Sequence, residues 1–168
     1  ECVIFNQFDE FGNPAWHRQV TGPAIAEAFA RGAGEGDRLA AFISATGSAG
    51  TIGAGDFLKK IHPHLKIVAA EAKQCPTLFQ NGFGAHRIEG IGDKHVPWVH
   101  NARNTDAVAA IDDEDSMRLL RLFNEPAGRR HLAESGVPEA LIARLGEIGI
   151  SGAANLIAAV WTARHFEM

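Results

Sequence analysis

The feature that most constrains the fold is a glycine-rich turn set between a strand-like run and a helical pattern. The apolar run Leu39–Ser44 predicts a strand, and residues 46–51, which read Thr-Gly-Ser-Ala-Gly-Thr, follow it directly. A helical pattern then continues to about Ile61, where His62 and Pro63 end it. This order brings free backbone amides and the positive end of a helix dipole to one point. The sequence therefore predicts an anion-binding turn in an α/β fold.

Short apolar runs alternate with helical patterns along the rest of the chain. Further strands are predicted at residues 3–5, 65–71 and 107–111, with mostly loop between 76 and 104. One helix is predicted to start at Thr21, which can cap the turn that opens with Gly22 and Pro23. Other helices are predicted at 112–123, 127–145 and 151–166, the last of them amphipathic. This alternation is typical of an α/β fold with a parallel, helix-covered three-layer sheet.

Length and chain ends bear on domain organisation. The chain has 168 residues, which suffices for one domain with a substantial core. It does not begin with Met, and it stops at the end of a helical pattern, whereas a βα series normally returns to the sheet. We therefore expect residues 1–168 to form a single α/β domain fragment whose sheet is incomplete at both ends.

Charge, hydropathy and cysteine usage exclude several function classes. The net charge is −4, and acidic and basic residues are interleaved without the basic stripe of a nucleic-acid or anionic-membrane binder. The longest apolar stretch, Leu156–Trp161, is far shorter than the roughly 20 residues that span a bilayer. No secretory signal opens the chain. Cys2 and Cys75 fit no zinc or redox spacing, and we expect reduced thiols in the cytoplasm.

The glycine-rich turn leaves other functions open. Gly47, Gly50 and Gly53 also match a dinucleotide fingerprint, and Glu71 follows about 20 residues later, where a ribose partner belongs. An NAD(P)-binding oxidoreductase domain is therefore one alternative. Short-chain dehydrogenases of this type use a Tyr-x-x-x-Lys pair, however, and the sequence contains no tyrosine. A plain turn without a ligand and a non-catalytic anion-binding or assembly module are further alternatives.

Metal and hydrolase sites are not predicted. The eight histidines form no set of three or four ligands at zinc-site spacing. The run from Gly47 to Gly50 misses the Gly-x-Ser-x-Gly spacing of a hydrolase nucleophile elbow by one residue.

Five segments, in a fixed order, resemble the cysteine synthase family of pyridoxal-phosphate (PLP) enzymes. The first has Asn-Gln-Phe, Asn-Pro, His and Thr-Gly-Pro within residues 6–23, and resembles the family stretch Gln-Phe-x-Asn-Pro…His…Thr-Gly-Pro. The second resembles the family's Gly-Thr-Gly-Gly-Thr phosphate loop. The other three resemble its next strand, its Ile-Gln-Gly-Ile-Gly…Ile-Pro segment and its Ser-Ser-Gly-Ala-Ala turn. These four lie at 47–51, 66–71, 88–97 and 151–154. The resemblance implies the tryptophan synthase β-like PLP fold (fold type II).

The resemblance also implies roles for individual residues. The cofactor phosphate would be held by Gly47, Ser48, Ala49, Gly50 and Thr51. Gln7 would contact the substrate carboxylate, Gly90 would lie beside the cofactor ring, and Ser151 would hydrogen-bond the pyridine nitrogen. Each has a structural alternative: Gln7 as a surface amide, Gly90 as a simple turn, and Ser151 as a helix N-cap.

The chemistry implied by the resemblance is β-elimination or β-replacement on a small amino-acid substrate, catalysed with PLP by a cytoplasmic homodimer. The sequence departs from the family in three places. Ala49 stands where the family has glycine, one serine stands at 151 where two are usual, and residues 127–147 look like an insertion.

The largest departure concerns the lysine that bonds the cofactor. The family's Ser-x-Lys-Asp-Arg type motif does not occur here, and nothing around the five lysines resembles it; they are Lys59, Lys60, Lys66, Lys73 and Lys94. We therefore expect this lysine upstream of Glu1, in a missing N-terminal portion of the same enzyme. This chain alone would then hold no catalytic residue and be inactive.

Overall fold

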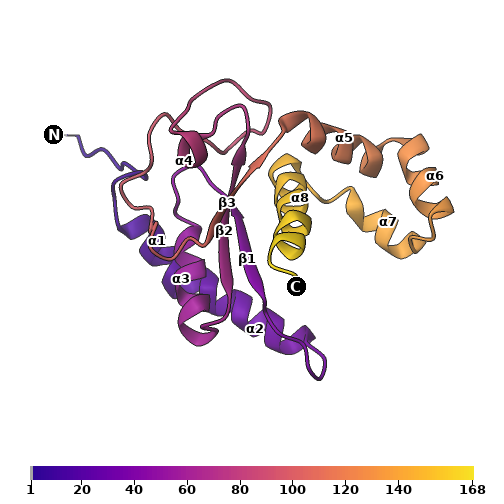
Figure 1. Ribbon diagram of the computed structural model, residues 1–168, viewed down its shortest axis with the longest axis horizontal. Helices are drawn as coiled ribbons and strands as arrows, with labels where there is room; N and C mark the ends of the chain where they lie inside the picture. Colours follow the sequence, from indigo (N-terminus) through magenta and orange to yellow (C-terminus); the bar gives the residue numbers. More distant parts are fainter. Residues whose placement is uncertain (1) are drawn as a thin grey trace.

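The computed structural model describes residues 2–168 and contains a parallel three-stranded sheet in the order β1–β2–β3 (Figure 1). Strand β2 pairs with β1 and with β3, with Ala41 opposite Lys66 and Val68 opposite Ala107. The strands have the bounds Ala41–Ala45 (β1), Lys66–Ala72 (β2) and Ala107–Ile111 (β3). Three predicted strands and the parallel, helix-covered α/β class are thus confirmed.

Helices from the first part of the chain cover one face of the sheet (Figure 1). Three of them follow one another almost without a break, and α3 comes after strand β1. Ile67 and Ala69 of β2 pack on this side with Ile52 and Leu58 of α3. The elements are α1 (Gly12–Trp16), a π-helical turn η1 (His17–Thr21), α2 (Gly22–Gly32) and α3 (Ile52–Ile61). Because η1 runs directly into α2, the predicted N-cap role of Thr21 is wrong. Its hydroxyl instead lies 3.0 Å from Nδ1 of His17.

Helix α8 (Ile150–His165) covers the other face. Val68 and Ala70 of β2 pack against Ala154 and Ala158, and these small side chains let the helix approach the sheet closely. Helix α5 (Asp113–Asn124) packs beside α8, while α6 (Pro126–Glu134) and α7 (Glu139–Leu145) extend beyond the sheet as an arm (Figure 1). This arm contains most of the predicted insertion at 127–147. A single helical turn, α4 (Thr77–Gln80), lies in the long β2–β3 connection.

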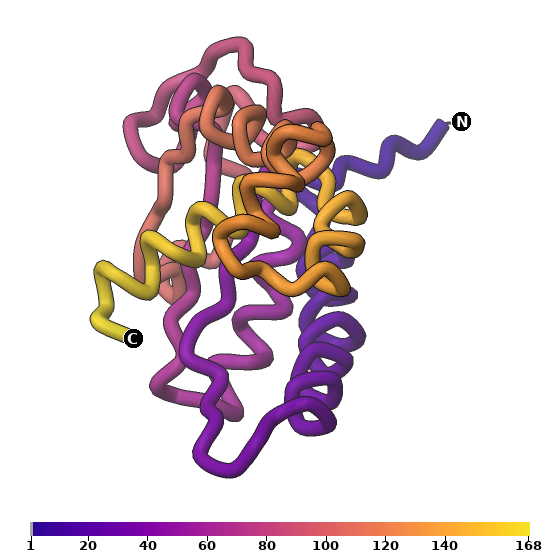
Figure 2. The backbone as a smooth tube through the Cα atoms, turned by 90° about the vertical axis from the view of Figure 1, so that its right-hand side faces the viewer, coloured from indigo at the N-terminus to yellow at the C-terminus, as the bar shows by residue number. Residues whose placement is uncertain are grey.

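Two predictions about the chain ends are wrong. Residues 3–5 form no strand: the segment pairs with none of the described strands and extends away from the body in both views (Figures 1 and 2). An apolar run becomes a strand only where a neighbouring backbone satisfies its hydrogen bonds. Helix α8 is not amphipathic, because Leu156, Val160 and Trp161 are exposed on its outer face.

Two further features concern the membrane and the cysteines. No helix among residues 2–168 has the length and hydropathy needed to cross a membrane. Both cysteines are free, Cys2 on the surface and Cys75 in the core.

Candidate functional site

The loop of residues 46–51 joins the carboxyl end of β1 to the start of α3. Helix α3 begins at Ile52, with Thr51 as its N-cap residue. The hydroxyls of Ser44 and Thr51 lie 2.5 Å apart and tie the two ends of the loop together. Within the described part of the chain, the backbone amides of residues 47–51 donate no hydrogen bond. The predicted loop therefore presents unpaired donors at a helix N-terminus, where an anion is favoured.

Ala49 gives this loop its tight bend. Its φ is 63°, in the left-handed region, and its side chain is buried against the core that contains Ile52. An L-residue in this conformation costs roughly 1–2 kcal/mol relative to the right-handed one, which is why glycine is the usual choice. The loop thus keeps a backbone shape suited to glycine although the sequence has alanine there.

The N-terminal segment forms one wall of the site. The side-chain amide of Asn13 donates to the Gln7 carbonyl at 2.8 Å and to Ser48 Oγ at 3.1 Å. A Cβ atom on Gly50 would lie 2.1 Å from Asn13 Oδ1, and one on Gly53 would lie 2.3 Å from the Pro14 carbonyl oxygen. The packing of the Asn13–Pro14 segment therefore requires glycine at both positions, whether or not a ligand is bound.

The opposite wall is the segment that contains Gly90 and Gly92. Both glycines have positive φ, of 81° and 83°. The Gly92 amide donates to the Thr46 carbonyl at 3.1 Å, so this segment is hydrogen-bonded to the glycine-rich loop. Ile88 is fully buried and fixes the start of the wall in the core.

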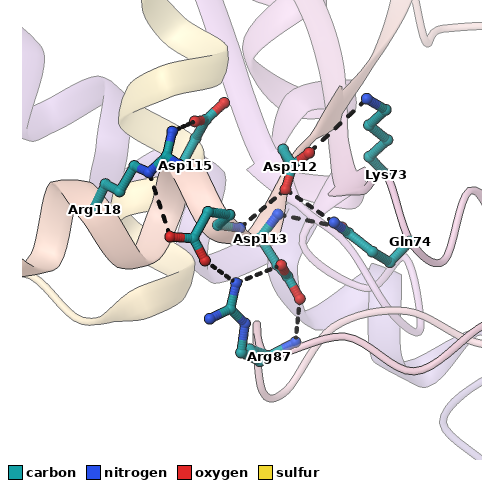
Figure 3. A network of polar contacts seen from close by, with 8 residues as sticks. Lys73, Gln74, Arg87, Asp112, Asp113, Asp115 and Arg118 are labelled. Atoms are coloured by element: carbon teal, nitrogen blue, oxygen red, sulfur yellow. Dashed lines mark hydrogen bonds and ion pairs between the residues drawn. The ribbon is translucent and has the colours of Figure 1, made fainter.

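A polar network anchors this wall to the end of β3 (Figure 3). The carboxylate of Asp113 accepts from the Arg87 backbone amide at 2.8 Å and from its guanidinium at 2.9 Å. Asp113 is 7% exposed, and the hydrogen bond from Arg87 lowers the pKa of its carboxyl. Next to it, Asp112 accepts from Gln74 at 2.9 Å and caps α5 by accepting from the Glu114 amide at 3.0 Å.

These walls enclose a cleft of about 380 Å³, within the usual range for small-molecule sites. It brings together seven of the eight predicted site residues: Gln7, Gly47, Ser48, Ala49, Gly50, Thr51 and Gly90. Sequence reasoning assigned no role to Asn13 or to His17, which also lines the cleft. The pairing of glycines at 50 and 53 could have indicated a closely packed neighbour, but not which one.

Ser151 does not line this cleft. It lies in the first turn of α8, half-buried, and the N-cap of that helix is Gly149. One turn later, Asn155 Oδ1 accepts from the Ala45 amide at 2.6 Å, at the carboxyl end of β1. Residues four apart share a helix face, so Ser151 lies on the face turned toward this end of the sheet. Its predicted contact with a pyridine nitrogen stays a prediction.

Glu71 is not placed to bind a ribose. Its side chain is 2% exposed, and its carboxylate accepts from the amides of Leu78 and Phe79 at 2.8 and 2.9 Å. The dinucleotide alternative therefore loses the acidic partner on which it depended. Among residues 2–168, no group of three or more His, Cys, Asp or Glu side chains is arranged to hold a metal ion.

Comparison with known proteins decides between the remaining alternatives. No protein-family model matches the chain. A probable cysteine synthase of Bacillus subtilis is 32% identical over 160 residues, 95% of this chain and 45% of that protein. The cysteine synthase of Staphylococcus aureus is 31% identical over 123 residues, 73% of this chain and 38% of that protein. A hydrogen sulfide-producing enzyme from Fusobacterium nucleatum superposes with a TM-score of 0.73 at 26% identity, covering 94% of this chain and 42% of its own.

The relatives of this chain are enzymes of the cysteine synthase family. The resemblance inferred from the sequence is thereby confirmed. The chain spans between 38% and 45% of the length of the two curated cysteine synthases above.

The cysteine synthase family implies PLP, and the cleft fits its phosphate group. The backbone amides of residues 47–51 donate no hydrogen bond within the described residues and lie next to the N-terminus of α3, where a phosphate is favoured. The cleft holds no amine, however, because none of the lysines lines it. Lys59 and Lys66 pair with Asp106, Lys73 pairs with Asp112, and Lys94 lies over the Phe83 ring. The predicted position of the cofactor-bonding lysine, upstream of Glu1, lies outside the described residues.

Proposed function

We propose that this chain is the cofactor-phosphate-binding part of a PLP enzyme that eliminates or replaces the β-substituent of a small amino acid. The observation that carries the proposal is the set of unpaired amides at 47–51, facing a cleft that Gln7 and Gly90 also line. Relatives named cysteine synthase and a structural neighbour named hydrogen sulfide-producing enzyme support a reaction on a small sulfur-containing amino acid.

The loop residues would bind the phosphate through both backbone and side chain. Because Asn13 donates to Ser48 Oγ, the Ser48 hydroxyl hydrogen is free to donate to a phosphate oxygen. Thr51 keeps its hydroxyl on Ser44 and contributes its backbone amide. Gln7, on the facing wall, would hold the substrate carboxylate through its side-chain amide.

PLP, when bound, supplies the electron sink for reactions at the α- and β-carbons of an amino acid. Ser151 would set how that sink is used. A serine hydroxyl is neutral and does not place a proton on the pyridine nitrogen as an acidic partner does. We propose that Ser151 thereby favours loss of a β-substituent over transamination in the intact enzyme.

The catalytic lysine would come from outside this chain. The proposal rests on the cleft, which no lysine of residues 2–168 lines, and on the ion pairs that occupy Lys59 and Lys73 elsewhere. This chain alone would then bind the cofactor without turning over an amino acid. An N-terminal portion of the same enzyme, within a cytoplasmic homodimer, would complete the site.

The phosphate-binding role can be tested by titrating the 168-residue chain with PLP, with pyridoxal and with inorganic phosphate. We expect PLP to bind at least about tenfold more tightly than pyridoxal, which lacks the phosphate, and phosphate to compete. Ser48→Asp places a negative charge among the loop amides and should abolish the preference. Ser135→Asp adds the same charge at an exposed site and should bind like the unmodified chain. Equal affinity for PLP and pyridoxal would contradict the proposal.

A further inference from the structure

Glu71 is a buried carboxylate to which the site described above gives no role. It lies near the end of β2, and within the described residues no lysine or arginine forms an ion pair with it. Its two oxygens instead accept from the backbone amides of Leu78 and Phe79, in the helical turn α4. A carboxylate so placed is costly to bury, and only these two hydrogen bonds compensate for the loss of water. Burial raises its pKa, which the two hydrogen bonds partly counter.

Helix α4 connects Glu71 to the wall of the cleft. Thr77, its first residue, donates its hydroxyl to the Asp93 carbonyl at 2.5 Å. The adjacent Gly92 donates its amide to the Thr46 carbonyl at 3.1 Å. Gly92 lines the cleft, and Thr46 begins the glycine-rich loop. A chain of short contacts thus runs from the buried carboxylate to the wall that contains Gly92, and from there to the glycine-rich loop.

The packing between these groups leaves no room for adjustment. The cavity that Glu71, Thr77 and Thr46 share with Gly92 and His100 measures about 10 Å³. This is at the lower limit for a single water molecule, so water cannot readily replace a lost carboxylate oxygen. A displacement of α4 must therefore be passed on to the segment that Thr77 holds.

We propose that Glu71 is a positioning residue: by fixing α4, it holds the Gly92–Asp93 segment through Thr77 and so sets the separation between this wall of the cleft and the glycine-rich loop. The consequence for cofactor affinity rests on the proposed PLP function, whereas the mechanical link does not. Glu71 acts through Thr77 and touches no ligand itself.

The mechanical link is tested by amide hydrogen exchange on the ligand-free chain. Glu71→Gln keeps the shape but turns one acceptor into a donor, and should speed exchange at Leu78, Phe79 and Gly92 by about tenfold or more. Thr77→Val replaces the hydroxyl with a methyl group of similar size, so Gly92 should respond while Phe79 does not. Thr77→Ser should restore the exchange rate of Gly92.

Two references separate positioning from a general loss of stability. Glu134→Gln changes an exposed carboxylate on α6 and should leave all these rates unchanged. The Ala69 amide, in the central strand, reports global opening and should be unaffected in Thr77→Val. If Gly92 exchanges at the original rate in both variants, or only in step with Ala69, the inference is overturned. Should Glu71→Gln fail to fold, Thr77→Val decides the matter alone.

The binding consequence is tested by titrating the same variants with PLP. We expect Glu71→Gln and Thr77→Val to weaken PLP by about tenfold and Thr77→Ser to restore the affinity. Unchanged affinity in a chain that binds PLP would overturn the inference. If the unmodified chain binds no PLP, the proposed function fails, and the exchange rates still decide whether Glu71 positions the wall.

Discussion

The side-chain amide of Asn13 donates a 3.1 Å hydrogen bond to the hydroxyl of Ser48, joining two segments that lie 35 residues apart. The same amide donates to the Gln7 carbonyl at 2.8 Å. One side chain therefore sets the distance between the proposed phosphate loop and the proposed substrate contact. It also leaves the Ser48 hydroxyl hydrogen free for a ligand.

Replacing Asn13 should weaken the site more than it weakens the fold. Asn13→Ala loses two hydrogen bonds, and we expect about 1–2 kcal/mol lower stability and about tenfold weaker PLP binding. Asn13→Asp removes the donor and adds a charge beside the loop, so it should bind PLP more weakly still. Asn124→Ala, at an exposed helix end, is the control for stability. Unaltered PLP affinity in Asn13→Asp would show that this contact does not shape the site.

The left-handed conformation of Ala49 predicts how substitutions at this position change stability. A β-branched side chain is strongly disfavoured at a φ of 63°, so Ala49→Val should lower the free energy of unfolding by about 2 kcal/mol or more. Ala49→Gly relieves the strain but loses a buried methyl group and adds freedom to the unfolded chain. These terms nearly cancel, and the change should stay within about 1 kcal/mol. Chemical denaturation of the three proteins checks the order, and a tolerated valine would show that the bend is not left-handed.

Local signals in the sequence predicted the elements that carry the loop. The run ending at Ser44, the glycines that follow and the stop at His62 are neighbours in sequence, so their physics is visible without a fold. The same holds for β3, whose apolar residues precede the capping Asp112. Gln7 and Gly90 were predicted from the family resemblance and not from a local pattern, and both line the cleft.

Contacts between distant segments could not be predicted. The acceptors that Asn13 and Arg87 would find depend on how the chain folds back, and no local pattern encodes them. The apolar residues 3–5 looked like a strand because alternation and propensity say nothing about whether a neighbour exists. Glu71 matched a ribose-binding position by spacing, but its carboxylate accepts hydrogen bonds from two backbone amides of α4 instead.

The buried carboxylate of Asp113 should contribute to the stability of the chain and to the shape of the cleft. Asp113→Asn removes the charge that two Arg87 donors share, and we expect a loss of about 2 kcal/mol in stability together with weaker PLP binding. Asp115→Asn is the matched control, because its ion pair with Arg118 is exposed and should contribute less than about 0.5 kcal/mol. Equal effects of the two substitutions on thermal unfolding would contradict this role.

The environment of His100 predicts a pH dependence of stability. Its Nε2 lies 3.2 Å from the Thr105 hydroxyl, and its Nδ1 is buried without a partner among the described residues. Burial lowers its pKa below the ordinary 6.5, and the nearby Asp56 only partly offsets this. Asp56 accepts from Asn101 and Asn104 through Oδ1, at 2.9 and 2.7 Å.

Proton linkage gives the direction in which stability changes with pH. The folded-state pKa of His100 lies below the unfolded one, so the unfolded chain binds more protons in that window, and stability present above pH 6.5 is lost as the pH falls through the folded value. His100→Gln keeps a polar partner for Thr105 without titrating. Lowering the pH from about 7.5 to about 5.5 should therefore reduce the free energy of unfolding of the unmodified chain more than that of the variant, as measured by chemical denaturation at each pH. Glu71, which lines the same small cavity, is unchanged in both proteins, so parallel stability curves would rule out His100 as the titrating group.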